Sequence, residues 1–438
     1  MILKLSWKNI WRNKTRSGVI LGAIAIGLFA GTYTTAFMNG WMIGTVNDEV
    51  NTNMSHFQIR DTAFAANNDV NAFFNKSAIK KQKLEELNIR ASYRLNINGM
   101  LSSANSAVGV RANGVNPEEE MMISTVWQTV PDTMGYFLDA ELCAKLGKNI
   151  NTTQQRSPIV ISQKTATKLK VRLGSKIVLS FQDAVGEMQT MSFRVCGVFH
   201  TSNTGFDEGN VFVRYDDLLP VTALPDGAAH VAALRIISED FTKAENLRAY
   251  YTNDQQILKK ISLIAPEIKA LFPDYEVKTW EEISPMLAMS LGWTDVMAVV
   301  VLGIFLLALA FGIINTMLMA VLERTRELGM LRAIGMSRRK VFYMIMLETV
   351  FLTLVGSIAG IIIATAVIIP SLHSGIDLTP LMGDTFEDFG YSSIIYPIIN
   401  AEMFVEIIFL VIAAGILSAI YPARKALKLN PLEAIRNN

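Results

Sequence analysis

The chain has 438 residues, with 40 Lys and Arg against 39 Asp and Glu and a formal net charge of +1 at pH 7. This balance disfavours nucleic acid as a partner, because nucleic-acid-binding proteins are usually basic. Hydrophobic residues make up 51% of the sequence and gather in long runs, which is unusual for a soluble protein.

The N-terminal segment, residues 1–16, is basic and amphipathic. Its apolar residues alternate with Lys4, Lys8 and Arg12, and two of them are Trp7 and Trp11. This pattern is typical of a helix that lies in the cytoplasmic interface of a membrane. An unstructured basic tail is the alternative.

Four apolar runs follow, and each approaches or exceeds the roughly 20 residues that a membrane-crossing helix needs. A cleaved signal peptide is disfavoured for the first run, because its apolar stretch is about twice the usual length for such a peptide. The core helices of a large soluble protein are a weaker alternative. The sequence therefore predicts transmembrane helices at residues 17–43, 296–322, 341–369 and 403–421.

The segment between the first two runs, residues 47–285, has the composition of a folded domain of mixed structure. Alternating apolar residues predict strands, and helical spacing predicts helices between them. The expected fold is a membrane protein with four transmembrane α-helices and a large α+β periplasmic domain inserted between helices 1 and 2. Strands are predicted at 56–60, 107–115, 158–162, 176–181, 191–199, 210–214 and 231–237, and helices at 75–87, 163–170, 241–251 and 255–271.

The distribution of charge predicts the orientation. Lys and Arg concentrate in residues 1–16, 323–340 and 422–438, whereas the charged residues of 371–402 are all acidic. Short basic segments stay in the cytoplasm. We therefore expect a multi-pass protein of the cell inner membrane with both termini cytoplasmic, a cytoplasmic segment at 323–340, a short periplasmic loop at 371–402 and a cytoplasmic tail at 422–438.

No pattern in the sequence indicates catalysis. There is no G-x-x-x-x-G-K-[ST] loop for nucleotide phosphates and no H-E-x-x-H or C-x-x-C arrangement for a metal. We expect no enzymatic activity, no metal site and no cofactor in this chain, and the sequence leaves the substrate-binding residues unknown. Cys143 and Cys196 lie in the predicted periplasmic domain, where a disulfide is permitted, but a buried free thiol is favoured for Cys196.

Small residues recur every fourth position in three of the predicted spans. This spacing places them on one face of a helix, where another helix can approach closely. Packing within the chain and a mobile interface in an oligomer are both consistent with the pattern. The predicted packing residues are Ala23, Gly27, Gly31, Ala308, Gly312, Gly356 and Gly360.

The connection at residues 323–340 is charged and rich in helix formers. Ion pairs are predicted between Glu323 and Arg326 and between Arg324 and Glu327. The apolar residues gather on one side, which suits docking into a groove of another protein better than a solvated connector does. After the fourth run, Asn430 and Pro431 predict the start of a short helix.

Residues 323–341 (ERTRELGMLRAIGMSRRKV) and 421–436 (YPARKALKLNPLEAIR) resemble the permease subunits of the FtsX, LolC/LolE and MacB superfamily of ABC transporters. The order of one span, a large outer domain and three spans resembles it too. In that family, the helix between the second and third spans docks on an ATPase. The resemblance assigns this coupling role to Glu323, Arg324, Arg326, Glu327, Leu328, Leu331, Arg332 and Gly335.

The resemblance also implies partners. A separate ABC ATPase subunit would bind ATP and magnesium, and a second permease copy or a paralogue would complete a dimer in the lipid bilayer. Residues 53–60 (NMSHFQIR) and 110–120 (VRANGVNPEEE) are most similar to the LolC/LolE type, which extracts lipoproteins from the inner membrane for a periplasmic carrier. A MacB-like exporter with an adaptor and an outer-membrane duct, and FtsX-like signalling to a periplasmic hydrolase, are the alternatives.

Overall fold

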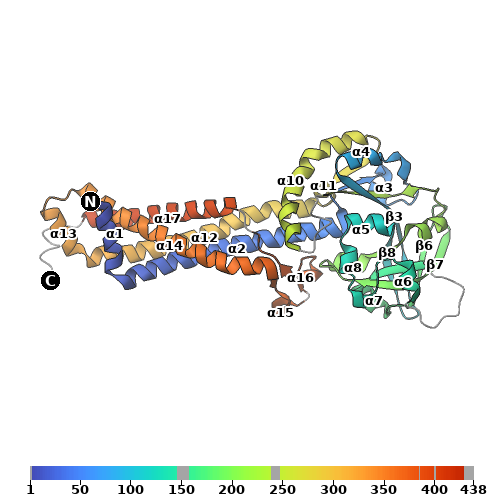
Figure 1. Ribbon diagram of the computed structural model, residues 1–438, viewed down its shortest axis with the longest axis horizontal. Helices are drawn as coiled ribbons and strands as arrows, with labels where there is room; N and C mark the ends of the chain where they lie inside the picture. Colours follow the sequence, from blue (N-terminus) through green and yellow to red (C-terminus); the bar gives the residue numbers. More distant parts are fainter. Residues whose placement is uncertain (1, 146–156, 238–246, 384, 399–400, 429–438) are drawn as a thin grey trace. The chain divides into compact units, whose positions relative to one another are not determined.

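The computed structural model describes residues 2–145, 157–237, 247–383, 385–398 and 401–428 (Figure 1). The chain divides into two compact units. The helical unit consists of Met1–Met42, Gly292–Ile376 and Ile395–Asn438, and the sheet unit consists of Ile43–Leu291 and Asp377–Ile394.

The helical unit is built mainly from long apolar helices. Four candidate spans, by length and composition, lie within the described residues, as the sequence predicts. They are longer than the predicted apolar runs because polar residues extend them at their ends. The helices are α1 (Ile2–Arg12), α2 (Lys14–Glu49), α12 (Pro285–Glu323), α13 (Thr325–Ala333), α14 (Arg338–Ser374) and α17 (Ala401–Lys428).

These helices share one apolar core, to which α1, α2, α12, α13, α14 and α17 all contribute. Trp7 of α1 packs edge-on against Phe351 of α14, with 5.5 Å between the ring centroids. On α12, Val299 and Phe311 are instead 70% and 64% exposed. An apolar surface of this kind suits a lipid environment, since lipid tails are as apolar as the side chains that face them.

The predicted packing glycines differ in what surrounds them. A Cβ atom added at Gly356 would lie 2.8 Å from Ile24, and one added at Gly360 would lie 2.9 Å from the carbonyl oxygen of Ala25. Gly27 and Gly31 similarly face Leu309 and Leu302 of α12. By contrast, Ala23 and Ala308 are exposed, and a Cβ at Gly312 would meet no atom within 4 Å.

The sheet unit has α+β architecture, with a mixed nine-stranded sheet in the order β11-β1-β10-β3-β4-β8-β5-β7-β6. Parallel pairing occurs between β4 and β8 and between β5 and β7. The strands of this sheet are β1 (Phe57–Arg60), β3 (Ile89–Ser102), β4 (Ala107–Val115), β5 (Ser157–Ser162), β6 (Lys176–Gln182), β7 (Met188–Phe199), β8 (Asn210–Arg214), β10 (Val231–Ile236) and β11 (Glu276–Thr279).

Short helices and two small two-stranded sheets complete the sheet unit. The small sheets pair β2 (Phe74–Asn75) with β9 (Ala228–Ala229) and β12 (Ile376–Asp377) with β13 (Ile394–Ile395). The helices are α3 (Thr62–Asn67), α4 (Lys81–Glu86), α5 (Pro117–Ile123), α6 (Ala140–Lys145), α7 (Gln163–Leu169), α8 (Thr204–Gly209), α9 (Tyr215–Leu218), α10 (Leu247–Leu271), α11 (Trp280–Ile283), α15 (Thr379–Met382) and α16 (Thr385–Asp388).

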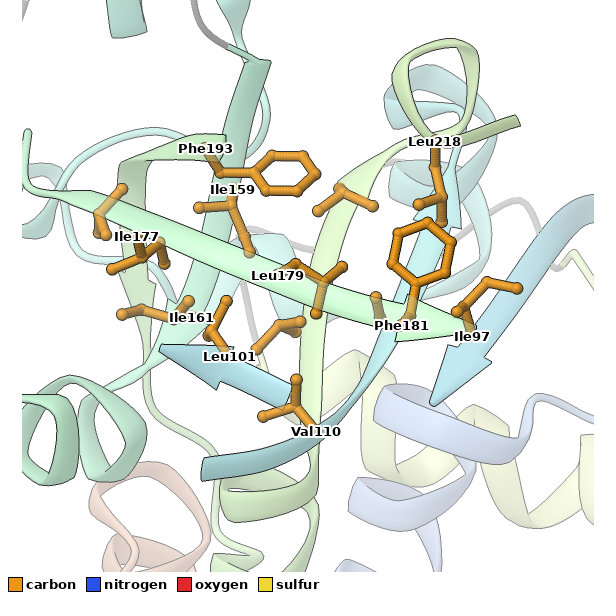
Figure 2. Packing of buried hydrophobic residues seen from close by; sticks show 14 of the residues in the cluster. Ile97, Leu101, Val110, Ile159, Ile161, Ile177, Leu179, Phe181, Phe193 and Leu218 are labelled. Atoms are coloured by element: carbon orange, nitrogen blue, oxygen red, sulfur yellow. The ribbon is translucent and has the colours of Figure 1, made fainter. Parts of the chain in front are cut away.

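Besides a smaller cluster around Phe199 and Phe212, two larger apolar cores stabilise the described part of the sheet unit. One packs strands β3 to β8 together, with Leu101, Ile159, Leu179 and Phe193 pointing into a shared interior (Figure 2). The other places α10 against β1 and β10, and it includes Val46 from the end of α2. The helix α2 has residues in both units. It continues as a helix beyond its apolar run because Val46 is buried in this core of the sheet unit.

The helix predicted at 75–87 is wrong, because residues 74–78 form β2 and a 3₁₀ turn and only Lys81–Glu86 is α-helical. The long strand β3 has no counterpart in the predictions. Part of the predicted helix 241–251 and the predicted helix start at Asn430 lie outside the described residues. Cys143 and Cys196 are both buried free thiols.

Candidate functional site

The helix α13 has defined ends. Arg324 departs from helical geometry, with φ −105° and ψ 21°, and so separates α12 from α13. At the other end, Gly335 has φ +103°, a conformation that favours glycine. The amides of Gly335 and Met336 bond back to the carbonyls of Arg332 and Leu331 at 3.1 and 3.0 Å. This is a Schellman C-cap, which ends the helix and turns the chain toward α14.

A largely buried ion pair holds the start of α13. Arg324 Nη1 lies 3.1 Å from Glu348 Oε1 of α14, and the two side chains are 11% and 6% exposed. Arg324 Nη2 also donates to the carbonyl oxygen of Asn9 in α1 at 3.2 Å. One guanidinium therefore joins three helices, and charge-assisted bonds of this kind are stronger and more directional than neutral ones.

A second set of contacts ties α1 to the same region. Arg12 at the end of α1 forms an ion pair with Glu327 of α13, and both side chains are about half exposed. Ser6 Oγ donates to the carbonyl oxygen of Met344 in α14 at 3.1 Å. As a result, α13 is connected to α1 and α14 by side-chain bonds as well as by the chain itself.

A cavity of about 470 Å³ lies among these helices. Its walls combine apolar side chains with the Arg324–Glu348 and Arg12–Glu327 pairs. The apolar part of the lining includes Leu5, Met317, Ala320, Leu331, Met344 and Ile345. Because each cation in the wall is paired with a carboxylate, the cavity carries no evident excess of either charge.

The predicted coupling residues differ in how far they are exposed to solvent. Leu328 is buried in the core of the helical unit and Leu331 packs against that core, so these two leucines face inward. Glu323, Arg326 and Gly335 are exposed, whereas Arg324, Glu327 and Arg332 are intermediate. The predicted apolar ridge is therefore mainly a packing surface.

The exposed apolar residues of this region are Met330, 46% exposed, and Ile334, 85% exposed.

The predicted pairing of Arg324 with Glu327 is wrong. Arg324 pairs with Glu348, and Glu327 pairs with Arg12. Arg12 and Asn9 were not among the residues predicted for this site. The only local signal was the amphipathic, basic character of residues 1–16.

Among the residues that the structure describes, no group of three or more His, Cys, Asp or Glu side chains is arranged to hold a metal ion. The surface around α13 combines apolar side chains with paired charges, a combination that suits recognition of another molecule.

The same stretch of chain is recognised by comparison with known families. Residues 299–431 match the sequence profile described as FtsX-like permease C-terminal. We refer to residues 299–431 as the FtsX-like region. This FtsX-like region contains α13, the Arg324–Glu348 pair, α14, α17 and most of α12, whereas Arg12 and Asn9 lie outside it.

Individual relatives are ABC transporter permeases. The chain is 31% identical over 163 residues to the uncharacterized ABC transporter permease MJ1507 of Methanocaldococcus jannaschii, covering 37% of this chain and 38% of that protein. It is 38% identical over 125 residues to the macrolide export ATP-binding/permease protein MacB of Chlorobium luteolum, covering 28% of this chain and 16% of the relative. The chain thus spans well under half the length of these relatives.

A solved structure also resembles the chain. The periplasmic region of MacB from Actinobacillus actinomycetemcomitans aligns with 56% of this chain and 98% of its own, with a TM-score of 0.32 and 12% sequence identity. This similarity is too low to carry an argument.

Proposed function

We propose that this protein is the membrane-spanning subunit of an ABC transporter, driven by an ABC ATPase that docks on the exposed surface around α13. The observation that carries the proposal is the attachment of α13. This helix lies in the FtsX-like region, and Arg324 joins it to both Glu348 and the carbonyl of Asn9. The ATPase partner binds ATP and magnesium.

The attachment of α13 is what a force-transmitting element requires. A helix held only by its two chain connections would rotate when a partner moved it, and the movement would be lost. Here Arg324 and Glu327 connect α13 to α14 and α1. A push on the exposed side of α13 would therefore displace these helices together.

The docking surface is the exposed side of α13 and the turn that follows it. Ile334 is 85% exposed, next to the glycine that ends the helix. An exposed apolar residue with charged neighbours is a typical anchor in protein interfaces. Here the apolar residue is Ile334, and Arg326 is one of the charged residues of the same surface. Because Leu328 and Leu331 face inward, they support this surface and are not expected to contact the ATPase.

The docking proposal is tested by replacing Ile334 with Asp. The candidate ATPase should bind the Ile334→Asp variant on the order of tenfold or more weakly, as expected for an interface anchor. Leu381→Asp is the matched control, because Leu381 of α15 is 83% exposed and lies outside α13 and the turn that follows it. Copurification and ATPase stimulation in lipid nanodiscs measure the effect. Equal binding by both variants would place the docking surface elsewhere.

For the cargo we propose lipoproteins, which the transporter extracts from the inner membrane and passes to a periplasmic carrier. The similarity of residues 53–60 and 110–120 to the LolC/LolE type supports this substrate class. The sheet unit would lie in the periplasm and respond to movement in α2 and α12, both of which contribute residues to it. A second copy of the chain, or a paralogue, would complete the transporter.

A MacB-like exporter of peptides or amphiphiles is the second candidate, and the sequence similarity to MacB favours it. The two functions differ in what leaves the membrane. The complex is reconstituted in liposomes with a lipoprotein and a soluble carrier, and ATP-dependent transfer to the carrier is measured. Normal ATPase activity without transfer would exclude the lipoprotein function and leave the exporter.

A further inference from the structure

A short loop of the sheet unit receives contacts from two segments that are far apart in the sequence. We define the junction loop as residues 200–204, from the end of β7 to the first residue of α8. The end of α2 contacts it from one direction. Ser202 Oγ donates to Asp48 Oδ2 at 2.8 Å, and Asn203 Nδ2 donates to Glu49 Oε2 at 2.7 Å. The loop is therefore bonded directly to the helix that forms the first candidate span.

The second segment is α16, which belongs to the connection between α14 and α17. His200 Nε2 lies 3.2 Å from Glu387 Oε2. Thr204 Oγ1 and Lys164 Nζ donate to Asp388 Oδ1 at 3.2 and 3.1 Å. Both carboxylates of α16 thus meet partners on or beside the junction loop, and the α14–α17 connection is held there by polar contacts.

The other ring nitrogen of His200 faces a second carboxylate. His200 Nδ1 lies 3.3 Å from Asp207 Oδ2. Asp207 is fully buried and also accepts bonds from Thr201, from the amide at 3.1 Å and from Oγ1 at 2.6 Å. Asp207 is therefore fixed in place, and His200 is positioned between a fixed carboxylate in α8 and the carboxylate of Glu387 in α16.

This geometry distinguishes the two protonation states of the ring. A protonated imidazole has two N–H donors and can donate to both carboxylates. A neutral ring has one donor, so its other nitrogen presents a lone pair to a carboxylate. The proton would stay on Nδ1, because Asp207 is fixed, and the contact with Glu387 would become repulsive.

The surroundings favour the charged ring. The hydrogen bond with Asp207 raises the pKa of His200 above its usual value, and the negative charges of Glu387 and Asp207 act in the same direction. Partial burial and the charge of Lys164 oppose this rise in pKa. The other charged groups at the junction are Asp388 in α16 and Asp48 and Glu49 in α2, and all three are carboxylates.

We propose that His200 is a pH-sensitive clasp, which in its protonated form holds the α14–α17 connection against the junction loop that α2 also contacts. The clasp links two membrane-helix connections at one point of the sheet unit. It does not depend on the identity of the ATPase or of the cargo. The clasp is closed below the usual histidine pKa of about 6.5 and opens as the pH rises through the higher pKa of the folded protein.

The experiment measures the mobility of α16 directly. A spin label is attached to a Phe389→Cys variant of the full chain in nanodiscs, because Phe389 is 75% exposed and adjoins Asp388. The native thiols, Cys143 and Cys196, are 3% and 0% exposed and should not react. Spectra are recorded between about pH 5 and pH 9, the range in which histidines titrate.

With His200 present, the label should be immobilised at low pH and become mobile as the pH rises. In the His200→Gln variant, mobility should not change over this range. Glu387→Gln should shift the midpoint to lower pH, because it removes one charge that raises the pKa of His200. His373→Gln, at the end of α14, is the matched control and should titrate like the parent.

Two results would overturn the clasp. One is a label whose mobility is independent of pH when His200 is present. The other is a His200→Gln variant that titrates like the parent. A variant that fails to fold is recognised by size-exclusion chromatography, and the Glu387→Gln midpoint then decides the question, since a midpoint equal to that of the parent excludes the Glu387 contact.

Discussion

Arg324, at the start of α13, forms an ion pair with Glu348 of α14, with 3.1 Å between Nη1 and Oε1. The pair is nearly inaccessible to solvent. Removal of one partner from such a pair leaves a buried charge without compensation, which typically costs about 3–5 kcal/mol. The pair therefore helps to hold the start of α13 against α14.

We expect Glu348→Ala to destabilise the helical unit by about 3 kcal/mol or more. The matched control is Arg12→Ala, because the Arg12–Glu327 pair is about half exposed. Exposed pairs contribute about 0–1 kcal/mol. Denaturant unfolding in detergent micelles measures both variants. Equal losses would show that burial of the Arg324–Glu348 pair has no energetic consequence.

We expect Gly360→Ala to destabilise the packing of α2 against α14 by about 1–3 kcal/mol. The new Cβ would lie 2.9 Å from the carbonyl oxygen of Ala25 and 3.0 Å from Leu28 Cβ, and backbone cannot move aside cheaply. Gly312→Ala in α12 is the control, since no atom lies within 4 Å of the new Cβ. A thermal melt of each variant in the same detergent tests this difference. A Gly360→Ala melting temperature equal to that of Gly312→Ala would contradict it.

The buried charge of Glu120 should stabilise the sheet unit through three bonds. Arg94 Nη2 donates to Glu120 Oε1 at 2.7 Å, and Ser92 Oγ and Arg94 Nε donate to Oε2 at 2.8 and 3.2 Å. Glu120→Ala leaves Arg94, which is 6% exposed, without its carboxylate, so we expect a loss of about 3–5 kcal/mol. Glu119→Ala is the control, since its contact with Lys81 is 3.9 Å long and more exposed. Similar unfolding midpoints for the two variants would contradict the prediction.

The stability of the sheet unit should fall in mild acid because of His56. Burial lowers the pKa of His56 well below its usual value, and the nearby charge of Arg235 lowers it further. Its Nδ1 accepts a bond from the amide of Ile236 at 3.0 Å, which requires a neutral nitrogen. The unfolded chain binds a proton near pH 6.5 and the folded chain does not, so stability is lost as the pH falls below about 6.5.

The slope contributed by His56 is about 1.4 kcal/mol per pH unit at most. His56→Gln should reduce the slope between about pH 6.5 and pH 5. His230, whose pKa burial also lowers, should still contribute in that variant. His200 has a raised pKa, so its contribution is complete below pH 6.5 and changes only at higher pH. An unchanged slope in the His56→Gln variant, measured by urea unfolding at each pH, would exclude His56 as a source.

Much of the sheet was evident in the sequence, but its longest strand, β3, was not. Strands β4 and β8 have the predicted bounds, because the apolar residues of β4 alternate and those of β8 form a short buried run. Strand β3 contains Asn96, Asn98 and Gly99, which are residue types that are depleted in strands. Its stability comes from neighbours on both sides, including β10 and β4, and from the pairing of Arg94 with Glu120. None of these partners is local in the sequence.

The four apolar helices, and the charged helix between two of them, could be predicted from the sequence alone. Hydropathy and helical periodicity are local properties, so a window of about 20 residues is enough to predict them. Which side of α13 is exposed depends on tertiary packing, which buries Leu328 and leaves Ile334 exposed to solvent. Tertiary packing also paired Arg324 with Glu348 and placed His200 between Asp207 and Glu387. These contacts join residues on different elements, and only the packing of those elements selects one partner among the many that the composition allows.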